Sequence, residues 1–248
     1  MTVEAPALVR PIGARYDRQF YTGMAIAAAV VVFVGFAPTY FLRGSYQTTS
    51  LPTYLQVHGF LFTTWIGLFI AQTSLVAVRR TNVHRRLGWA MAALAVVMVV
   101  VGTTAGIWSM RRQGDAGFVK EAQAFLTTPL FSMMAFAGFV ATAIVRRRDS
   151  QIHKRLMLLA MISVLWAAFG RFRHYFPPFE RSFLLFQGIV PLSMILLVML
   201  WERLTKGKVH AVYLWVGLPL LAENLAEIYF FDSPGWQAAS SWIAAYFL

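Results

Sequence analysis

The sequence predicts an all-α fold, an integral membrane helical bundle of about seven transmembrane helices with no soluble domain of any size. Of the 248 residues, 58% are hydrophobic and only 13% are charged, whereas globular domains usually carry about 25% charged residues. Mean hydropathy is +0.60, and the apolar residues gather in runs of roughly 20, the length that crosses a bilayer core. Short basic clusters separate these runs, as in the loops of membrane proteins.

The whole chain is expected to form one transmembrane domain, with a cytoplasmic segment 1–19, seven spans within 20–231 and an outer interfacial tail 232–248. The first apolar run is too long for the hydrophobic part of a cleaved signal peptide, so we interpret it as a span. The tail is too short to cross, and Trp236 and Trp242 suit a segment that lies in the interface. The expected spans are Phe20–Leu42, Tyr54–Val78, Leu87–Trp108, Phe125–Val145, Lys154–Phe176, Phe183–Leu204 and Val209–Phe231.

The basic residues are distributed unequally over the two sides of these spans. One side holds fifteen: Arg10, Arg15, Arg18, Arg79, Arg80, Arg85, Arg86, Arg146, Arg147, Arg148, Lys154, Arg155, Arg203, Lys206 and Lys208. The other holds seven: Arg43, Arg111, Arg112, Lys120, Arg171, Arg173 and Arg181. This asymmetry predicts a cytoplasmic N-terminus and an external C-terminus. Because the basic residues lie in the loops between spans, the net charge of +12 does not require nucleic acid as a partner.

The sequence contains no cysteine, which excludes disulfides, thiolate metal sites and iron–sulfur clusters.

Two basic loops end in similar runs, HRRLG at 84–88 and HKRLM at 153–157, and each histidine follows a phenylalanine (Phe62, Phe131) by 22 residues. Two hairpins of the same orientation predict a four-helix core, formed by the second to fifth spans, with a pseudo-twofold axis along the membrane normal. The alternative is that any basic loop before an apolar helix looks alike.

The histidines near the span ends are candidate ligands of haem b. His84 and His153 open spans on the cytoplasmic side, whereas His58 and His174 lie on the outer side. A pair of imidazoles on different helices supplies both axial ligands of a six-coordinate iron. The alternative is that these are ordinary interfacial residues that reach toward the headgroups. Three arginines close to these histidines are candidates for pairing with haem propionates, namely Arg85, Arg155 and Arg171.

A second polar cluster is expected in the last span, where Glu223 and Glu227 share one helix face in the outer half of the membrane. Carboxylates at that depth need a partner. Together with His58 and His174 they can form a divalent metal site for zinc, iron or manganese. A proton or quinone site, and plain ion pairs with the outer arginines, are the other interpretations.

The sequence between roughly residues 54 and 175 resembles an uncharacterised family of bacterial multi-pass membrane proteins. More distantly it is similar to the diheme b-type cytochromes that oxidise ascorbate or related donors across membranes, which implies one haem ligand on each of four consecutive helices. The span Phe125–Val145 departs from that pattern, because Thr127 stands where a histidine is wanted and His174 would have to replace it. The resemblance is carried by His58, Gln72, Arg80, HRRLG (84–88), HKRLM (153–157) and Arg171.

These observations predict a haem-binding electron-transfer protein of the bacterial inner membrane, which exchanges electrons with quinone or another redox protein. A non-redox transporter or accessory subunit of a membrane complex stays open as an alternative. So does a metal-dependent membrane enzyme built on the outer His/Glu cluster. The sequence leaves open whether the protein has catalytic activity.

Overall fold

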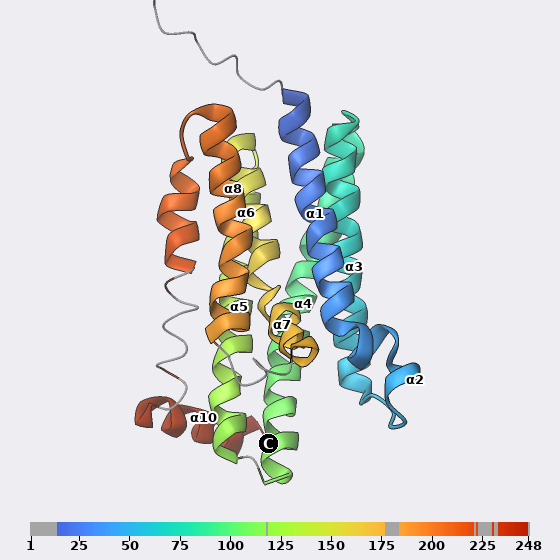
Figure 1. Ribbon diagram of the computed structural model, residues 1–248, viewed down its shortest axis with the longest axis vertical. Coiled ribbons are helices and arrows are strands. Elements are labelled where there is room, and N and C mark those ends of the chain that lie inside the picture. Colours follow the sequence, from blue (N-terminus) through green and yellow to red (C-terminus); the bar gives the residue numbers. More distant parts are fainter. Residues whose placement is uncertain are drawn as a thin grey trace, which may run out of the picture.

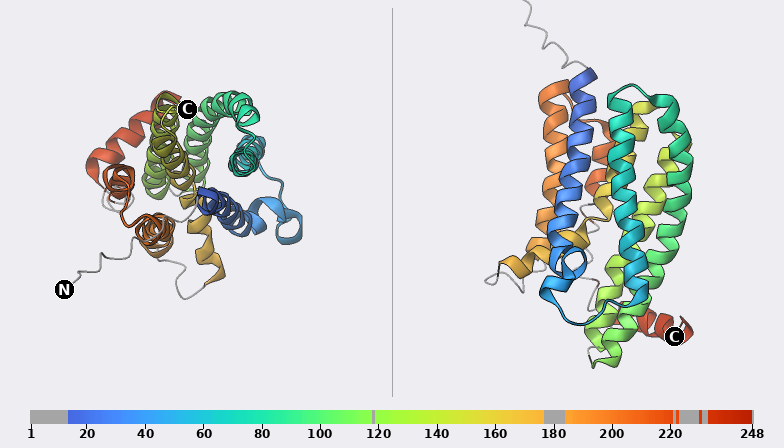
Figure 2. Two further views of the ribbon diagram at one scale, coloured as in Figure 1. Left: turned by 90° about the horizontal axis from the view of Figure 1, so that it is seen from above. Right: turned by 90° about the vertical axis from the view of Figure 1, so that its right-hand side faces the viewer.

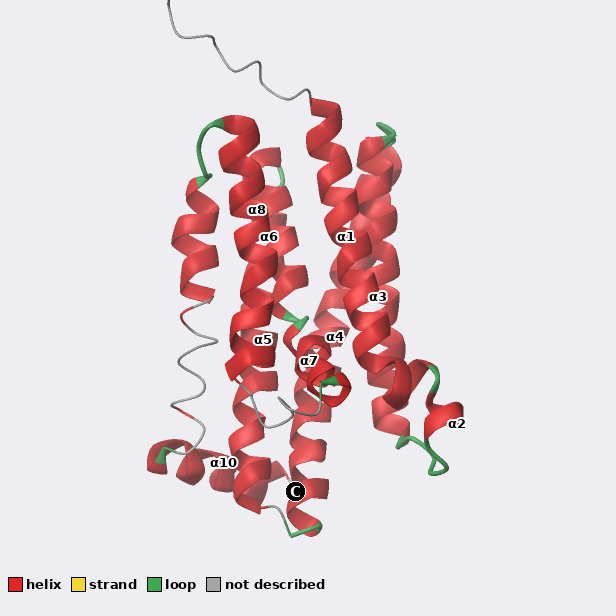
Figure 3. Ribbon diagram, viewed as in Figure 1, coloured by secondary structure: helices red, strands yellow, loops and turns green. Residues whose placement is uncertain are grey.

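The computed structural model shows a bundle of long helices that run close to one common axis (Figure 1). All regular secondary structure in the described residues is helical (Figure 3), which confirms the predicted all-α class. The structure describes residues 14–117, 119–176, 184–220, 222, 230 and 233–247.

Five helical stretches are long and apolar enough to cross a membrane, and they overlap the first five expected spans. They are Tyr16–Phe41, Thr53–Ala77, Thr81–Asp115, Val119–Val145 and Ser150–Tyr175. The corresponding elements are α1 (Ala14–Phe36) with the π-helical turn η1 (Ala37–Phe41), α3 (Thr53–Ala77), α4 (Thr81–Asp115), α5 (Val119–Val145), and α6 (Ser150–Ser163) with α7 (Trp166–Arg171) and the 3₁₀ turn η2 (Phe172–Tyr175).

The sixth and seventh expected spans stay predictions. A π-helical segment η4 (Leu184–Ile189) runs into α8 (Val190–Lys206) within the sixth. A π-helical turn η5 (Tyr213–Gly217) falls within the seventh, and much of the rest of that span lies outside the described residues. Gly207, with φ +72°, ends α8 in the left-handed conformation that terminates many helices.

Helix α6 occupies the middle of the bundle. In the span that contains it, 72% of the apolar stretch is buried, against 22–33% in the other four spans, whose outer faces are free to meet lipid. Its N-terminus is capped by Asp149, whose side chain accepts hydrogen bonds from the backbone N–H groups of Gln151 (2.9 Å) and Ile152 (3.2 Å). The cap fixes where α6 begins, and therefore which way the following basic residues point.

The hydrophobic core is wider than the expected four-helix core of the second to fifth spans. Met24 and Ala28 of α1, and Ile195 and Val198 of α8, belong to the same buried cluster as residues of α3–α6. Helix α1 packs closely on α7, since a Cβ atom added to Gly35 would lie 2.5 Å from the carbonyl oxygen of Ala168. The second to fifth spans therefore supply only part of the interior, because α1 and α8 also pack against α6 and cover the sides that α5 leaves open.

The two ends of the bundle differ in character. The basic end, defined by residues 79–86, 146–155 and 203–208, carries the α3–α4, α5–α6 and post-α8 turns and lies at the top in Figure 1. At the opposite end, α10 (Pro234–Phe247) lies across the long helices (Figure 2). The indole N–H of Trp236 donates to the carbonyl of Gln123 (2.8 Å), which attaches this helix to α5. A crosswise helix is the arrangement that an interfacial tail requires.

Candidate functional site

The structure brings His84 of α4 and His153 of α6 together at the basic end. Their ring centroids lie 6.3 Å apart, and the ring planes are nearly perpendicular, at 83°. Both side chains are half-buried. The pair forms because each histidine begins a helix that follows a basic turn, so two remote parts of the sequence meet at one level of the bundle.

The His153 ring is oriented by the end of the preceding helix. Its Nδ1 atom lies 2.8 Å from the carbonyl oxygen of Ala143. That carbonyl belongs to the last turn of α5, where the N–H of Arg147 bonds to Ile144 instead (3.3 Å), so it needs another donor. A carbonyl only accepts, so Nδ1 of a neutral His153 carries the proton and Nε2 keeps its lone pair.

The His84 ring is oriented by Gln72, a side chain of α3 that is only 6% exposed. In the amide orientation that satisfies every neighbour, the oxygen accepts from the N–H of Gly88 (3.0 Å). The NH₂ group then donates to the carbonyl (3.2 Å) and to Nδ1 (2.7 Å) of His84. Nδ1 is thus an acceptor, and the proton of a neutral His84 sits on Nε2. Gly88 lies beside Gln72, where an added Cβ would come within 3.6 Å of the side-chain amide.

Beside His153, the same turn of α6 contributes to a cluster of five charges, of which Arg155 and Glu202 are buried. This ion-pair cluster consists of Asp17, Lys154, Arg155, Glu202 and Lys206. Lys154 pairs with Asp17 of α1, and Arg155 pairs with Glu202 of α8. Lys206 bridges the two carboxylates, with its Nζ 2.9 Å from each. Arg155 and Glu202 are 1% and 0% exposed, so their charges depend on each other. Three successive residues of one turn therefore contact α5, α1 and α8.

Further hydrogen bonds complete this cluster. The Arg155 guanidinium donates to the carbonyl (2.6 Å) and side-chain oxygen (3.0 Å) of Gln151. The backbone N–H of His210 donates to Glu202 (2.8 Å). The hydroxyl groups of two buried tyrosines, Tyr21 and Tyr213, lie 3.2 Å apart below the charges. Arg155, expected to pair with a haem propionate, thus has both of its Nη groups bonded to protein groups, while its buried Nε has no hydrogen-bond partner. Arg85 is exposed and donates to Asn82.

Asp17 and Glu202 are not among the residues that the sequence predicts for the site. Asp17 lies before the first expected span, and Glu202 lies in the last turn of the sixth. The spacing of Glu202 and Lys206, four residues apart on one helix, was an available signal for an ion pair. No sequence signal connects either carboxylate to α6.

The outer residues are arranged differently from the expectation. His58 stacks on Phe62, with centroids 4.0 Å apart, and its buried Nδ1 has no hydrogen-bond partner. His174 is exposed and lies on the 3₁₀ turn η2. The expected straight helix breaks at Val164 and Leu165, where i→i+3 hydrogen bonds replace the α-helical ones, so His174 does not continue the face that carries His153. The charge near His58 is that of Arg171.

The predicted outer metal site cannot be traced in full, because Glu223 and Glu227 lie outside the described residues. Within the described part of the chain, no group of three or more His, Asp or Glu side chains is placed to hold a metal ion. His58 and His174 are thus not joined there by any third ligand.

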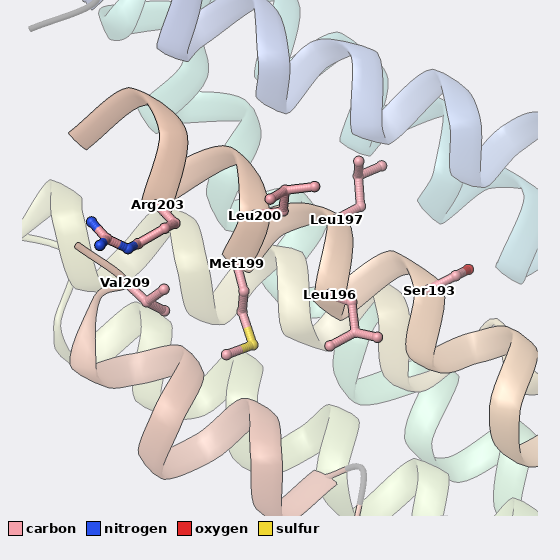
Figure 4. A pocket seen from close by; sticks show the side chains of 7 residues that line it. All are labelled: Ser193, Leu196, Leu197, Met199, Leu200, Arg203 and Val209. Carbon is pink, nitrogen blue, oxygen red and sulfur yellow. The ribbon is translucent and has the colours of Figure 1, made fainter. Parts of the chain in front are cut away.

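An apolar groove runs along the outer face of α8 (Figure 4), lined by Ser193, Leu196, Leu197, Met199, Leu200, Arg203 and Val209. Its single charged side chain, Arg203, donates to the carbonyl of Gly207. Such a surface suits lipid acyl chains rather than a redox cofactor, and none of the candidate ligands lines it.

Neither a protein-family model, nor a curated protein, nor a solved structure matches the chain. The resemblance to the uncharacterised bacterial family, and the more distant one to diheme cytochromes, stay predictions from the sequence. Function is therefore inferred from the geometry of the two ends of the bundle.

Proposed function

We propose that the protein is a membrane-embedded electron-transfer protein that holds one b-type haem between His84 and His153. The separation of the two rings is the observation that supports this most. Two metal–nitrogen bonds of about 2 Å each place the centres of two axial imidazoles roughly 6 Å apart. The centroids of His84 and His153 are 6.3 Å apart in the protein. A haem with both axial positions filled accepts and releases single electrons without binding substrate at iron.

The surroundings of each ring fit the ligand role to different degrees. His153 already donates Nδ1–H to Ala143, the outer hydrogen bond that fixes the tautomer and raises the basicity of a ligating imidazole. His84 reaches the same state only if the Gln72 amide turns so that its oxygen faces Nδ1. Arg85 is exposed beside the pair and is available for a propionate, whereas Arg155 is held by Glu202.

The proposal includes one haem and not two. His58 lies near the positive charge of Arg171, and His174 is exposed on η2, beyond the break in the helix that carries His153. These positions do not favour a second pair of axial imidazoles. The outer divalent metal site is also left out, because a cation next to His58 opposes a metal ion.

We place the protein in the bacterial inner membrane as a seven-span chain, with the basic end in the cytoplasm and the C-terminus outside. The distribution of fifteen basic residues against seven supports this orientation. The gathering of three basic turns at one end of the bundle supports it too. A haem at that end would exchange electrons with quinone or another redox protein at the cytoplasmic surface.

An absorption spectrum tests the proposal. Protein purified from cells that make ample haem should show low-spin b-type bands in a dithionite-reduced-minus-oxidised spectrum. His84→Ala and His153→Ala should each abolish these bands, because either change removes one axial ligand. His210→Ala is the matched control and should keep them, since the His210 side chain faces Val212 rather than the pair. A colourless wild-type protein would exclude haem binding.

A second candidate is a proton-coupled, non-redox transporter, which the opposite tautomers of the pair favour. His84 presents an Nε2–H donor and His153 an Nε2 acceptor, so a water molecule between them would be bonded to both. In that case the protein would be colourless, and proteoliposomes would show proton uptake that either histidine variant abolishes.

A further inference from the structure

Arg171 lies at the end opposite the basic end and forms no ion pair with a carboxylate of the described part of the chain. Arg171, the last residue of α7, donates from Nη1 to the carbonyl of Ala167 (2.7 Å), and its Cζ lies 4.1 Å from the ring centroid of Phe36. A guanidinium in a membrane-spanning helix normally has an anionic partner, because an unpaired charge there is costly.

His58 is the second polar group of this region. Its Nδ1 is buried without a hydrogen-bond partner, although the ring stacks on Phe62. The end of α1 connects the two groups: Phe36 covers Arg171, and Tyr40, four residues later, packs on Gly59 next to His58. A Cβ atom at Gly59 would lie 2.2 Å from the Tyr40 ring, so glycine is needed for this approach. Thus α1, α3 and α7 enclose both groups.

We propose that Arg171 and His58 form a binding site for an oxyanion, a carboxylate or a phosphate group, at the end of the bundle opposite the basic end. The bond to Ala167 uses Nη1 alone, which leaves the Nε and Nη2 edge of the guanidinium for a second partner. This planar edge matches two oxygens of a carboxylate or phosphate. The imidazole Nδ1–H would supply a third donor.

The sign of the charge selects the ligand class. A metal ion would place a second positive charge next to Arg171. A neutral imidazole from another histidine would leave the positive charge of Arg171 without a counter-ion. An oxyanion neutralises Arg171 and satisfies His58 at once. The group can belong to a small soluble acid or to the headgroup of an outer-leaflet lipid, and both offer the same oxygens.

Thermal unfolding of the full-length protein in phosphatidylcholine nanodiscs tests the site, since a ligand that binds only the folded state raises the midpoint. The probes are sodium acetate and sodium phosphate, each against sodium chloride at equal ionic strength, and nanodiscs with phosphatidylglycerol. We expect at least one oxyanion to raise the midpoint of the wild type by several degrees, about what 1–2 kcal/mol gives a chain of this size. A response to the soluble anions identifies a free ligand, and a response to phosphatidylglycerol alone identifies a lipid headgroup.

Three variants decide whether the effect belongs to this site. Arg171→Gln should lose the response and, without oxyanion, unfold at a higher temperature than the wild type, because it removes an uncompensated charge. Arg171→Lys keeps the charge but not the planar edge, so its response should be several-fold weaker at equal anion concentration. Arg112→Gln, an exposed arginine at the same end, should respond like the wild type. No oxyanion response in the wild type, or an equal one in Arg171→Gln, would overturn the site.

Discussion

The two histidine-led basic turns, His84-Arg85-Arg86 on α4 and His153-Lys154-Arg155 on α6, are similar in sequence and opposite in environment. In the first, both arginines are exposed, and Arg85 bonds only to Asn82 of its own turn. In the second, Lys154 and Arg155 reach two other helices. The α6 turn is surrounded by α1, α5 and α8, whereas the side chains of Arg85 and Arg86 are exposed. The position of a helix in the bundle, not the local sequence, decides whether its charges are solvated or paired.

This difference predicts that removal of a carboxylate from the α6 side will have the largest effect on stability. Glu202→Gln leaves Arg155 buried without its counter-ion, so the free energy of unfolding should fall by about 3–5 kcal/mol. Unfolding in an SDS titration measures the loss. Glu121→Gln, the same change at an exposed position of α5, is the control and should stay within about 0.5 kcal/mol of the wild type.

A paired replacement separates charge burial from poor packing. Arg155→Met combined with Glu202→Leu removes both charges and keeps side-chain volume, so it should recover most of the stability that Glu202→Gln loses. A mild effect of Glu202→Gln alone would mean that water reaches the cluster, and the contrast between the two turns would then be much smaller than their geometry indicates.

The long apolar runs made the first five spans predictable, because a bilayer requires helices of that length with few charges. The approach of His84 and His153 followed from two hairpins of the same orientation. The ion pairs could not be predicted in this way, since the choice of each partner depends on the rotation of each helix about its axis. Gln72 was visible as a polar residue within an apolar run, yet its role depends on a contact with another helix.

The outer end was harder to predict for a related reason. Pairing His58 with His174 assumed that the helix after His153 continues straight for a membrane thickness. The helix breaks at Val164 and Leu165, and the charge near His58 is that of Arg171. Neither residue of the break is proline or glycine, so the sequence carries no ordinary signal for it.

A smaller effect is expected from the residue that orients His84. Gln72→Glu introduces a carboxylate that can only accept, so His84 must carry its proton on Nδ1. If iron binds the pair, the more basic ligand stabilises the oxidised state, and the reduction potential should fall by on the order of 60 mV, a tenfold change for one electron. Redox titration followed at the haem absorption bands measures it.

The same residue can be tested without haem. In haem-free protein labelled with [¹⁵N]histidine, the His84 signal should show the Nε2–H tautomer, and His153 should show the Nδ1–H tautomer. Gln72→Glu should convert His84 to Nδ1–H and leave His153 unchanged, while Gln72→Leu should remove the bias without introducing a charge. An Nδ1–H tautomer of His84 in the wild type would contradict the amide orientation that Gly88 supports.

The smallest effect belongs to the exposed turn. Arg85→Ala should change the free energy of unfolding by less than about 0.5 kcal/mol, because the exposed Asn82 that loses its bond to Arg85 can bond to water instead. Arg155→Ala, in the other turn, leaves Glu202 buried with only Lys206 as a cationic partner and should lose several kcal/mol. The SDS titration used for Glu202 compares the two directly. Equal losses in the two variants would show that the two turns contribute alike to stability and that the burial of Arg155 has no special cost. If Arg85→Ala keeps its stability but retains less haem, Arg85 is assigned to the haem propionates.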